Sequence, residues 1–376
     1  MTPKIAGIAV AAAIAFAVGC AGSGGVSGLP PINSGGSTPT PVPTGKVALN
    51  DLGAGTYLGF EGGLYPNGAN NPPPAQDTAG MSHAAAVRPL DASGNPSASG
   101  KIVLLSIGMS NTTDEWCGGG DAAPCVASTF TALAQSGGLN KALVIADGAL
   151  GGQAAPSWLN PFSPPAPCLS PQVDGYCTNY DRVANVVLPP LGVTEKQVQV
   201  IWLKEADENP TISLPSSSAD AYTLEANLGH IVRAAKQRYP DLRMIFLSSR
   251  TYGGYATTSL NPEPYAYESA FAVKWLIQAQ INQMQNGTVD PIAGDLNYNN
   301  GTAPWLGWAA YLWANGTTAR SDGLIWCNGQ AGPPCNGEQD YQSDGTHPLN
   351  PVGTAKVGDQ LLNFFKTSPY TASWFL

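Results

Sequence analysis

The sequence predicts an α/β protein with a mainly parallel sheet. From Lys101 onward, short apolar runs alternate with amphipathic helical patterns, and this alternation is typical of β-α units. The predicted strands are residues 102–107, 142–146, 198–203 and 242–248, and the predicted helices are residues 128–135, 218–239, 265–284 and 352–365. The 376-residue chain leaves about 275 residues for this unit, which is enough for one sizeable core without a second domain.

The helix over residues 218–239 has the clearest pattern. Ser218 can cap its N-terminus, Asp220 lies in its first turn, and Pro240 follows its end. An apolar stripe at helical spacing is formed by Leu224, Leu228, Ile231 and Val232. The pattern predicts a helix with one buried face.

The N-terminus has the pattern of an export signal. Residues 1–19 combine a short basic start with an apolar run and the ending Ala-Val-Gly before Cys20. This ending resembles a bacterial lipobox, which implies cleavage before Cys20 and lipidation of its thiol. The alternative is an ordinary secretory signal in which Cys20 is incidental. No other apolar segment is long enough to cross a bilayer.

The rest of the chain divides by composition into three parts. Residues 20–45 are Gly, Ser, Pro and Thr with almost no apolar content, which predicts a flexible tether. Residues 46–100 predict an irregular lead-in that packs on the main domain, and the main domain covers residues 101–376.

A net charge of −9 with 11% charged residues excludes a nucleic-acid partner, because no basic run could neutralise phosphates. Uncharged glycans are compatible with this composition.

Six cysteines remain after Cys20, and they fall into three close pairs. An even number in an exported chain predicts disulfides, and short separations favour local pairing, although six cysteines allow about 15 connectivities. A zinc site lacks the close cysteine spacing and the nearby histidines that it would need. The pairs are Cys117 and Cys125, Cys168 and Cys177, and Cys327 and Cys335.

Conspicuous residues follow each predicted strand. They are Gly-Met-Ser-Asn at 108–111, Asp-Gly-Ala-Leu-Gly-Gly-Gln at 147–153, Lys-Glu-Ala-Asp at 204–207 and Ser-Arg-Thr-Tyr at 249–252. In an open parallel sheet, ligands bind beyond the carboxyl ends of the strands, so these loops converge on one edge. The sequence Asp-Gly-Thr-His at 344–347 precedes the last helix and can reach the same edge.

Four of these blocks together resemble the SGNH/GDSL-type hydrolases. The blocks are 108–111, 150–152 with Trp158 after it, 202–207 and 344–347, and the resemblance covers roughly residues 101 to 366. They are most similar to the branch that contains sialate O-acetylesterases and acetyl-xylan esterases. The resemblance implies a three-layer α/β/α, flavodoxin-like fold and no metal or organic cofactor.

The resemblance also implies catalytic roles. Ser110 would be the nucleophile, His347 the general base, and Asp344 the residue that orients the imidazole. The backbone N–H of Ser110, with that of Gly151 or Gly152, would form the oxyanion hole, because glycine lets the main chain approach a developing negative charge. The bland alternatives are a turn serine and a surface histidine. Of the other two histidines, His230 faces away from the loops on its predicted helix, and His83 has no assigned partner.

The third block departs from the family pattern. The side-chain amide expected in the oxyanion hole is missing, and Lys204 either replaces it or points away. Glu205 is a rival to Asp344 for His347, and Asn209 is a displaced candidate for the amide. Arg250 and Tyr252 line the cleft or are structural. Trp305, Trp308 and Trp313 stack on sugars or pack in the core, and core packing is the commoner case.

The sequence thus predicts a cell-envelope serine esterase that removes acyl groups, with acetyl on a carbohydrate as the expected case. Its partners would be an acylated small molecule or glycan and the membrane, reached through a lipid anchor at Cys20 in the periplasm or on the cell surface. Two alternatives keep the fold: a surface glycan-binding protein without turnover, and a lipase or thioesterase with the same triad.

Overall fold

The structure of the chain is a computed structural model that describes residues 45–119, 124–163, 173 and 175–376. These residues belong to one unit, which spans Thr38–Leu376. The predicted signal, Cys20, the tether up to residue 44 and Cys168 lie outside the described residues. In the described part of the chain, no helix is long and apolar enough to cross a membrane.

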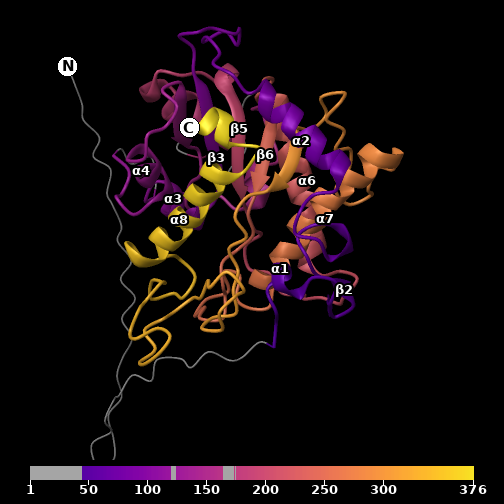
Figure 1. Cartoon of the computed structure of the whole chain (residues 1–376), viewed down its shortest axis with the longest axis vertical. Helices are drawn as coiled ribbons and strands as arrows, with labels where there is room; N and C mark the ends of the chain where they lie inside the picture. Colours follow the sequence, from indigo (N-terminus) through magenta and orange to yellow (C-terminus); the bar gives the residue numbers. More distant parts are fainter. Residues whose placement is uncertain (1–44, 120–123, 164–172, 174) are drawn as a thin grey trace, which may run out of the picture. The chain divides into compact units, whose positions relative to one another are not determined.

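A five-stranded parallel sheet lies at the centre of the unit (Figure 1). Its strands are β3 (Ile102–Gly108), β4 (Leu143–Asp147), β5 (Val198–Lys204), β6 (Met244–Leu247) and β7 (Trp305–Trp308), in the spatial order β4-β3-β5-β6-β7. Counted along the chain, this is the 2-1-3-4-5 order of flavodoxin-like folds, whose switch point lies between the first and third strands. The predicted α/β fold with a mainly parallel sheet is therefore confirmed.

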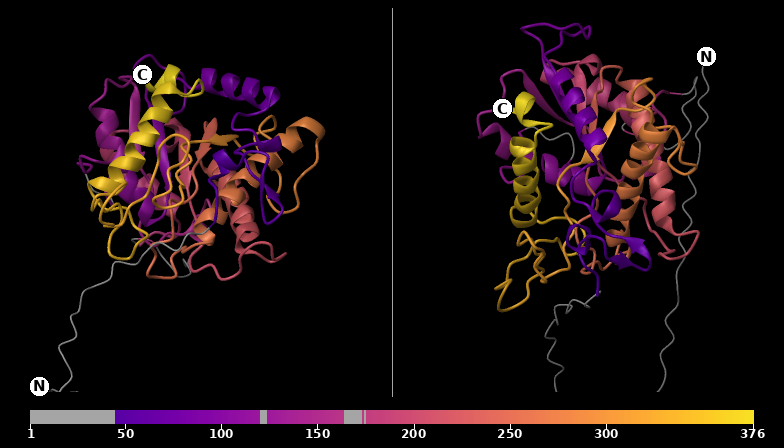
Figure 2. Two further views of the ribbon diagram at one scale, coloured as in Figure 1. Left: turned by 60° about the horizontal axis from the view of Figure 1, so that its bottom comes forward. Right: turned by 45° about the vertical axis from the view of Figure 1, so that its right-hand side comes forward.

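Helices cover both faces of this sheet. On one face α3 (Ser110–Trp116) and α4 (Phe130–Gln135) pack against α8 (Val352–Thr367), and α8 contacts α9 (Ala372–Phe375). On the other face α6 (Asp220–Arg238) packs against α7 (Tyr265–Asn286). The right-hand view of Figure 2 shows the yellow α8 and the orange α6 and α7 on opposite sides of the strands. The unit therefore has three layers.

The remaining elements are short, apart from one helix. The lead-in contains α1 (Leu49–Leu52), the hairpin β1 (Thr56–Tyr57) and β2 (Phe60–Glu61), and α2 (Pro74–Ala86), and α2 contacts β6, β7 and α9. Single turns are formed by η1 (Pro66–Gly68), η2 (Ala155–Trp158), α5 (Asn179–Arg182), η3 (Val183–Val187), η4 (Pro189–Leu191) and η5 (Glu195–Gln197).

An aromatic cluster holds α3 on the sheet. Every residue of β3 and β5 is buried, as expected for central strands of a parallel sheet covered on both faces. Trp116 of α3 stacks on Trp202 of β5, with ring centroids 5.0 Å apart, and also contacts Phe130 and Phe365. Burial of each such ring contributes roughly 1.5–3 kcal/mol. This packing fixes the helix that begins at Ser110.

All four predicted strands and all four predicted helices are present, with ends that differ by a few residues. The apolar stripe of α6 is buried, but Ser218 does not cap it, because the helix begins after Ala219 and has no side-chain cap. The other elements were not predicted, among them α2, α3 and β7. Trp305 and Trp308 belong to β7, and together with Trp313 they are buried, so these tryptophans pack in the core.

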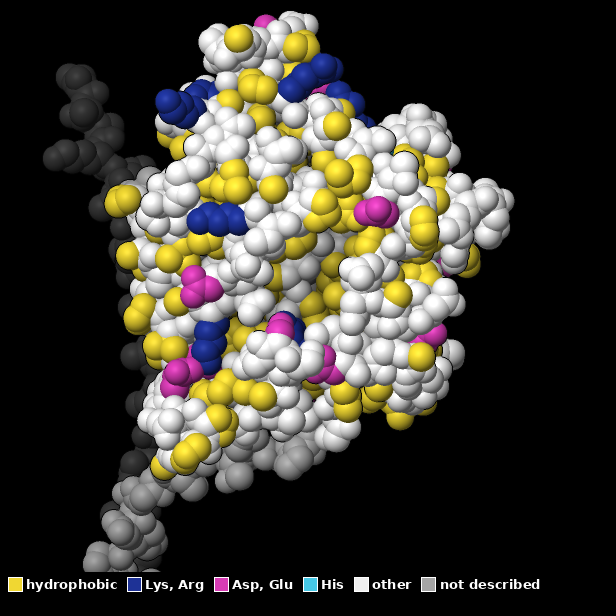
Figure 3. All heavy atoms as spheres, viewed as in Figure 1, with side chains coloured by type: hydrophobic (Ala, Val, Ile, Leu, Met, Phe, Trp, Pro, Cys, Tyr) yellow, Lys and Arg dark blue, Asp and Glu magenta, His cyan; other side chains and the backbone are white. Residues whose placement is uncertain are grey.

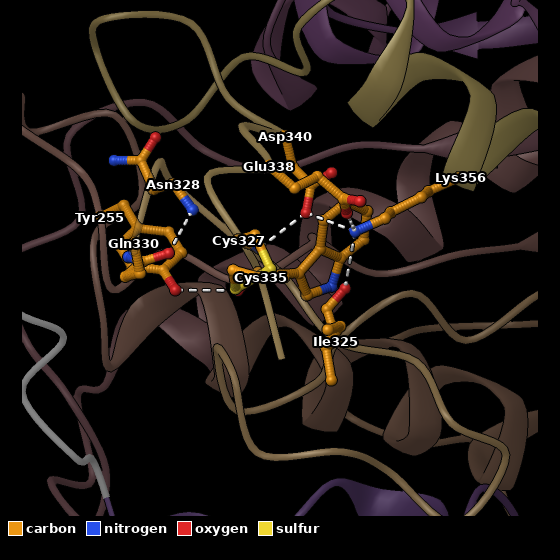
Figure 4. The surroundings of a disulfide bond; sticks show 10 residues. Tyr255, Ile325, Cys327, Asn328, Gln330, Cys335, Glu338, Asp340 and Lys356 are labelled. Atoms are coloured by element: carbon orange, nitrogen blue, oxygen red, sulfur yellow. Dashed lines mark hydrogen bonds and ion pairs between the residues drawn. A yellow bond between two sulfur atoms is a disulfide. The ribbon is translucent and has the colours of Figure 1, made fainter. Parts of the chain in front are cut away.

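Two predicted local disulfides are present among the described residues. They join Cys117 to Cys125 and Cys327 to Cys335. Cys177 is also disulfide-bonded. Figure 4 shows the bond of Cys327 beside Asp340, which accepts the Cys327 N–H at 2.6 Å and the Lys356 ammonium at 2.6 Å. This disulfide therefore lies next to the base of the loop that carries Asp344.

Candidate active site

Ser110 lies where β3 turns directly into α3. The turn is tight: a Cβ on Gly108 would lie 2.2 Å from the Thr112 hydroxyl and 2.5 Å from the Lys204 carbonyl oxygen. The Thr112 hydroxyl donates to that same carbonyl at 2.6 Å, which ties the start of α3 to the end of β5. Position 108 therefore has room only for glycine, and the half-buried Ser110 side chain stands at the carboxyl edge of the sheet, beside the switch point.

His347 and Asp344 lie on a hairpin-like loop before α8. The base of this loop is closed by a hydrogen bond of 2.7 Å from the Leu349 N–H to the Asp340 carbonyl. The next rung is a bond of 2.8 Å from the Gln342 N–H to the His347 carbonyl. Because the loop is closed by its own backbone, it can hold a side chain at its tip in a fixed position.

The structure brings Ser110, His347 and Asp344 together. The Nε2 atom of His347 lies 2.7 Å from the Oγ atom of Ser110, and its Nδ1 atom is hydrogen-bonded to Asp344 Oδ2. A general base needs a separation of roughly 2.6–3.2 Å from the group whose proton it takes. With Nδ1–H donating to the carboxylate, Nε2 is left as the acceptor for the serine hydroxyl. The three groups thus have the contacts that the predicted triad requires.

Asp344 is held as a carboxylate by three N–H donors. Besides the imidazole, the backbone N–H groups of Thr346 and His347 donate to its Oδ1 at 3.0 and 3.1 Å. Burial by itself would raise the pKa of Asp344, but these hydrogen bonds outweigh it and hold the pKa below its ordinary value. Asp344 is therefore charged at neutral pH and can stabilise an imidazolium.

Gly345 allows the loop to lie against the neighbouring chain. Its φ is +71°, in the region that favours glycine, and a Cβ there would lie 1.9 Å from the Tyr255 carbonyl oxygen. The Thr257 N–H donates to the Asp344 carbonyl at 2.9 Å from the same segment. The loop tip is thereby packed directly on residues that follow β6.

Asn111 ties the serine to the histidine loop. Its Nδ2 donates to the Thr346 carbonyl at 2.5 Å, and its Oδ1 accepts from Arg250 Nη1 at 2.6 Å. Asn111 and Arg250 are both buried. One amide side chain therefore connects the residue next to Ser110 with the residue before His347 and with the end of β6.

The backbone N–H groups predicted to form the oxyanion hole have no hydrogen-bond acceptor among the described residues. The N–H groups of Ser110, Gly151 and Gly152 donate to no carbonyl or side chain of the described residues. A Cβ built on Gly151 would lie 3.8 Å from the Ser110 Cβ, and Gly152 lines the same pocket as Ser110. Unpaired N–H groups beside a nucleophile are what a tetrahedral oxyanion requires.

A pocket of about 320 Å³ opens at these residues. Its wall is mostly apolar, with a few polar groups and one exposed carboxylate at Glu208. Such a combination is typical of a site for a small ligand or one end of a larger one. The lining residues are Met109, Ser110, Asn111, Gly152, Ala154, Glu208, Arg250, Leu260, Asn261 and His347.

Lys204 and Glu205 do not take the places considered for them. The Lys204 side chain is fully buried and pairs with both carboxylate oxygens of Glu115 at 2.5 Å, so it supplies no oxyanion donor. Burial lowers the pKa of Lys204 to about 8, although Glu115 acts in the opposite direction. Glu205 is not bonded to His347; burial raises its pKa well above the ordinary value, and its Oε1 has no described partner. Asp344 therefore has no rival at the imidazole.

Asn209 and Tyr252 also lie outside the pocket. Asn209 is exposed, and its Oδ1 accepts from the Ser259 hydroxyl, so it is not the displaced amide. Tyr252 is buried in edge-to-face contact with Tyr255 and Trp313. Arg250 is thus the one member of the predicted contact set that lines the pocket.

The sequence did not indicate several residues that shape the site. Asn261 reaches the pocket from the loop before α7, where it donates to the Asp207 carbonyl at 2.8 Å. Asp147 accepts from the hydroxyls of Ser106 and Thr113 at 2.5 and 2.7 Å, and burial raises its pKa to about 7. The position of Asp147 at a strand end was a signal for its place, but not for these partners.

Metal chemistry has little basis in the described residues. One group of three metal-ligand side chains is close enough together, and it consists of Cys327, Glu338 and Asp340. Cys327 is in a disulfide and Lys356 already pairs with both carboxylates, so the group is accounted for without an ion.

A larger cleft of about 670 Å³ lies away from this site. It runs between α8 and residues 64–77 and is seen as a hollow near the centre of the face in Figure 3. Its lining includes Trp308 and Phe364 but neither a serine beside a histidine nor a cysteine. The same face carries few, scattered charged side chains (Figure 3). The smaller pocket is therefore the candidate active site.

No protein-family model matches the sequence, and no curated protein matches it either. Solved structures show distant likeness. A salicylyl-acyltransferase from a tetracycline biosynthetic pathway is 16% identical over 73% of this chain, with a TM-score of 0.33, and the match spans 58% of that enzyme's length. An extracellular lipase from Streptomyces rimosus is 12% identical over 69% of this chain and 99% of its own, with a TM-score of 0.30. A carbohydrate esterase family 2 enzyme with a carbohydrate-binding domain from Corynascus thermopiles is 14% identical over 71% of this chain and 66% of its own, with a TM-score of 0.34. These likenesses are too slight to bear on activity.

Proposed function

We propose that the protein is a serine esterase that removes acyl groups through a covalent acyl-enzyme. The observation that carries this proposal is the continuous hydrogen-bonded chain from Ser110 through His347 to Asp344 at the mouth of a pocket. Serine is a poor nucleophile until an adjacent imidazole accepts its proton, and this arrangement provides that base.

The first half of the reaction transfers the acyl group to the enzyme. The Ser110 oxygen attacks the ester carbonyl carbon while its proton passes to His347 Nε2, and Asp344 stabilises the imidazolium that forms. The negative charge moves to the carbonyl oxygen, where the free N–H groups of Ser110, Gly151 and Gly152 are the available donors. When the tetrahedral intermediate collapses, the bond to the alcohol oxygen breaks and the imidazolium gives its proton to the leaving alcohol.

The second half releases the acid. A water molecule gives its proton to His347 Nε2 as its oxygen attacks the acyl carbon, and the bond to the Ser110 oxygen then breaks. Ser110 takes the proton back from the imidazolium, so each turnover consumes one ester and one water and yields one alcohol and one carboxylic acid. No step draws on a group other than these residues and water.

For the substrate and location we propose an acetylated carbohydrate and the cell envelope. The low content of charged residues and the abundance of uncharged polar residues support a glycan partner. The Ala-Val-Gly-Cys ending at Cys20 supports an exported lipoprotein, and the disulfides of the main domain fit an oxidising compartment.

The test is ester hydrolysis by the parent protein and by two serine variants. We expect release of 4-nitrophenol from 4-nitrophenyl acetate and of acetate from acetylated xylan. Ser110→Ala should lower kcat by at least about 10³-fold. Ser249→Ala is the matched control, because Ser249 is equally a strand-end serine, but its buried hydroxyl has no described partner and it does not line the pocket. Full activity in Ser110→Ala, or equal losses in both, would remove Ser110 from its role.

The non-catalytic glycan-binding alternative predicts a different result. It requires that the parent protein release no acetate while glycan binding survives Ser110→Ala and His347→Ala. It has less support, because a binding protein has no use for a serine, an imidazole and a carboxylate in one hydrogen-bonded chain.

A further inference from the structure

The charge of Arg250 is buried in the wall of the candidate active site. Arg250 follows β6, is 3% exposed, and lines the same pocket as Ser110 and His347. A guanidinium remains protonated in proteins, so this position carries a positive charge even though burial lowers its pKa. Charges so deeply buried are ordinarily paired.

The protein satisfies only part of this guanidinium. Its Nη1 donates to Asn111 Oδ1 at 2.6 Å, which is a neutral acceptor. The Nε atom is buried with no partner, and Nη2 donates to no described group. No carboxylate of the described residues forms an ion pair with Arg250. Nη2 is therefore left to meet a ligand in the pocket.

The acidic groups around Arg250 are committed elsewhere. Glu115 is paired with Lys204, and the Asp344 carboxylate is hydrogen-bonded to the His347 imidazole and to the backbone N–H groups of Thr346 and His347. Burial raises the pKa of Glu205 well above the ordinary value and so favours its neutral form. Tyr341 also faces Arg250, and burial raises its pKa, so it is neutral too. Asp344 therefore acts on Arg250 only through space, and no carboxylate of the described residues contacts the guanidinium itself.

We infer that Arg250 binds a carboxylate of the substrate, so that the ester hydrolysed at Ser110 belongs to a molecule that carries an acidic group near the ester. This inference rests on the proposed function and names its substrate class: an acylated sugar acid, or a half-ester of a dicarboxylic acid. A guanidinium is the side chain best suited to a planar carboxylate. Glu208 stands at the exposed rim, and the buried position of Arg250 places the anion below it.

The first experiment compares matched esters. One pair differs on the acyl side, 4-nitrophenyl hemisuccinate and 4-nitrophenyl butyrate, and the other differs on the alcohol side, acetylated methyl galacturonide and acetylated methyl galactoside. The parent protein should have at least about tenfold higher kcat/KM for the acidic member of one pair. Arg250 could also matter for activity by contacting the oxyanion or by holding Asn111 in place. Neither role predicts a preference for the acidic ester.

The variants separate these roles. Arg250→Gln should lower kcat/KM for the acidic ester at least about tenfold more than for its neutral partner, mainly through KM, and Arg250→Lys should restore part of the preference. The matched control is Arg243→Gln, because Arg243 is a half-exposed arginine at the opposite end of β6 and should leave the preference unchanged. An equal loss on both esters, expressed in kcat, would overturn the inference.

A binding measurement distinguishes failure of this inference from failure of the proposed function. Calorimetry with Ser110→Ala and with the parent protein should show methyl galacturonide or succinate binding more tightly than methyl galactoside, and Arg250→Gln should abolish the difference. Anion binding without hydrolysis of any ester would sink the esterase and keep the Arg250 site. Hydrolysis without any preference for an anion in either assay would sink the Arg250 inference alone.

Discussion

The sharpest test of the site replaces Asp344 by asparagine. In the native loop, Oδ1 accepts the two backbone N–H groups, and Oδ2 faces His347 Nδ1. An asparagine of the same shape can keep its oxygen on the backbone donors, so its NH₂ group then faces the imidazole. Two donors cannot share one hydrogen bond, and Nδ1 must become an acceptor.

The consequence for catalysis follows from the tautomer. If Nδ1 accepts, the proton moves to Nε2, and Nε2 can no longer take the proton of Ser110. The imidazolium also loses its neighbouring negative charge. The same change in a comparable triad lowers kcat about 10⁴-fold with little change in geometry. The loop should keep its structure, because the main loss is the hydrogen bond between the His347 imidazole and the charged carboxylate. Losing such a bond lowers the free energy of unfolding by about 1.5–3 kcal/mol.

Glu205→Gln is the matched control for this change. It also converts a carboxyl group into an amide near the end of a central strand, but Glu205 is not bonded to His347, and burial favours its neutral form by raising its pKa. We expect Glu205→Gln to stay within about threefold of the parent kcat while Asp344→Asn falls about 10⁴-fold. The assay is steady-state 4-nitrophenyl acetate hydrolysis, with urea unfolding to show that both variants fold.

Two results would refute this reasoning. If folded Asp344→Asn kept more than about a tenth of the parent kcat, the imidazole would be oriented by something other than Asp344. If Glu205→Gln lost as much activity as Asp344→Asn, Glu205 would take part in the reaction, although the structure shows no hydrogen bond between Glu205 and His347.

Three further predictions concern stability in urea unfolding. Gly345→Ala should lower the free energy of unfolding by about 2–5 kcal/mol, because its backbone is left-handed and the Tyr255 carbonyl lies close to the new Cβ. Gly301→Ala, with φ +80° and open space around it, should lower it by about 1–2 kcal/mol. Equal losses would contradict the packing argument. A carboxyl whose pKa is higher in the folded protein destabilises it as pH rises above the ordinary value near 4.3, so the stability of Glu205→Gln relative to the parent should increase as pH rises above that value; a flat difference would contradict a raised pKa at Glu205. Replacing Cys327 and Cys335 together by alanine should cost about 2–3 kcal/mol, and no loss would mean that the loop is already ordered without the bond.

Most of the sheet could be predicted from the sequence because its central strands are buried on both faces. Continuous apolar runs such as Ile102–Gly108 have no other simple explanation, and the order of the elements then restricts the topology. β7 could not be recognised in the same way, because it is four residues long and contains Gly307 between two tryptophans. α3 was missed since its seven residues are mostly polar, and it is held by Trp116 rather than by an apolar stripe.

The third block shows why motif spacing did not settle the side chains. Successive residues of a strand point to opposite faces, so a residue at a strand end can enter the pocket or the layer beneath the helices. The Lys204 side chain lies in the buried layer and not in the pocket, because Glu115 of α3 pairs with it there. That partner is 89 residues away in the sequence, and a helix that was not predicted carries it.

Asn111 illustrates a further limit and its consequence. Its two hydrogen bonds reach Thr346 and Arg250, 235 and 139 residues away, so its place in the block at 108–111 did not indicate either partner. Once the fold is formed, however, it links the residue after Ser110 to the residue before His347 and to Arg250. It also fixes one side of the Arg250 guanidinium while leaving Nη2 free. A single buried amide therefore contacts both the loop that carries the general base and the guanidinium that we infer binds the substrate carboxylate.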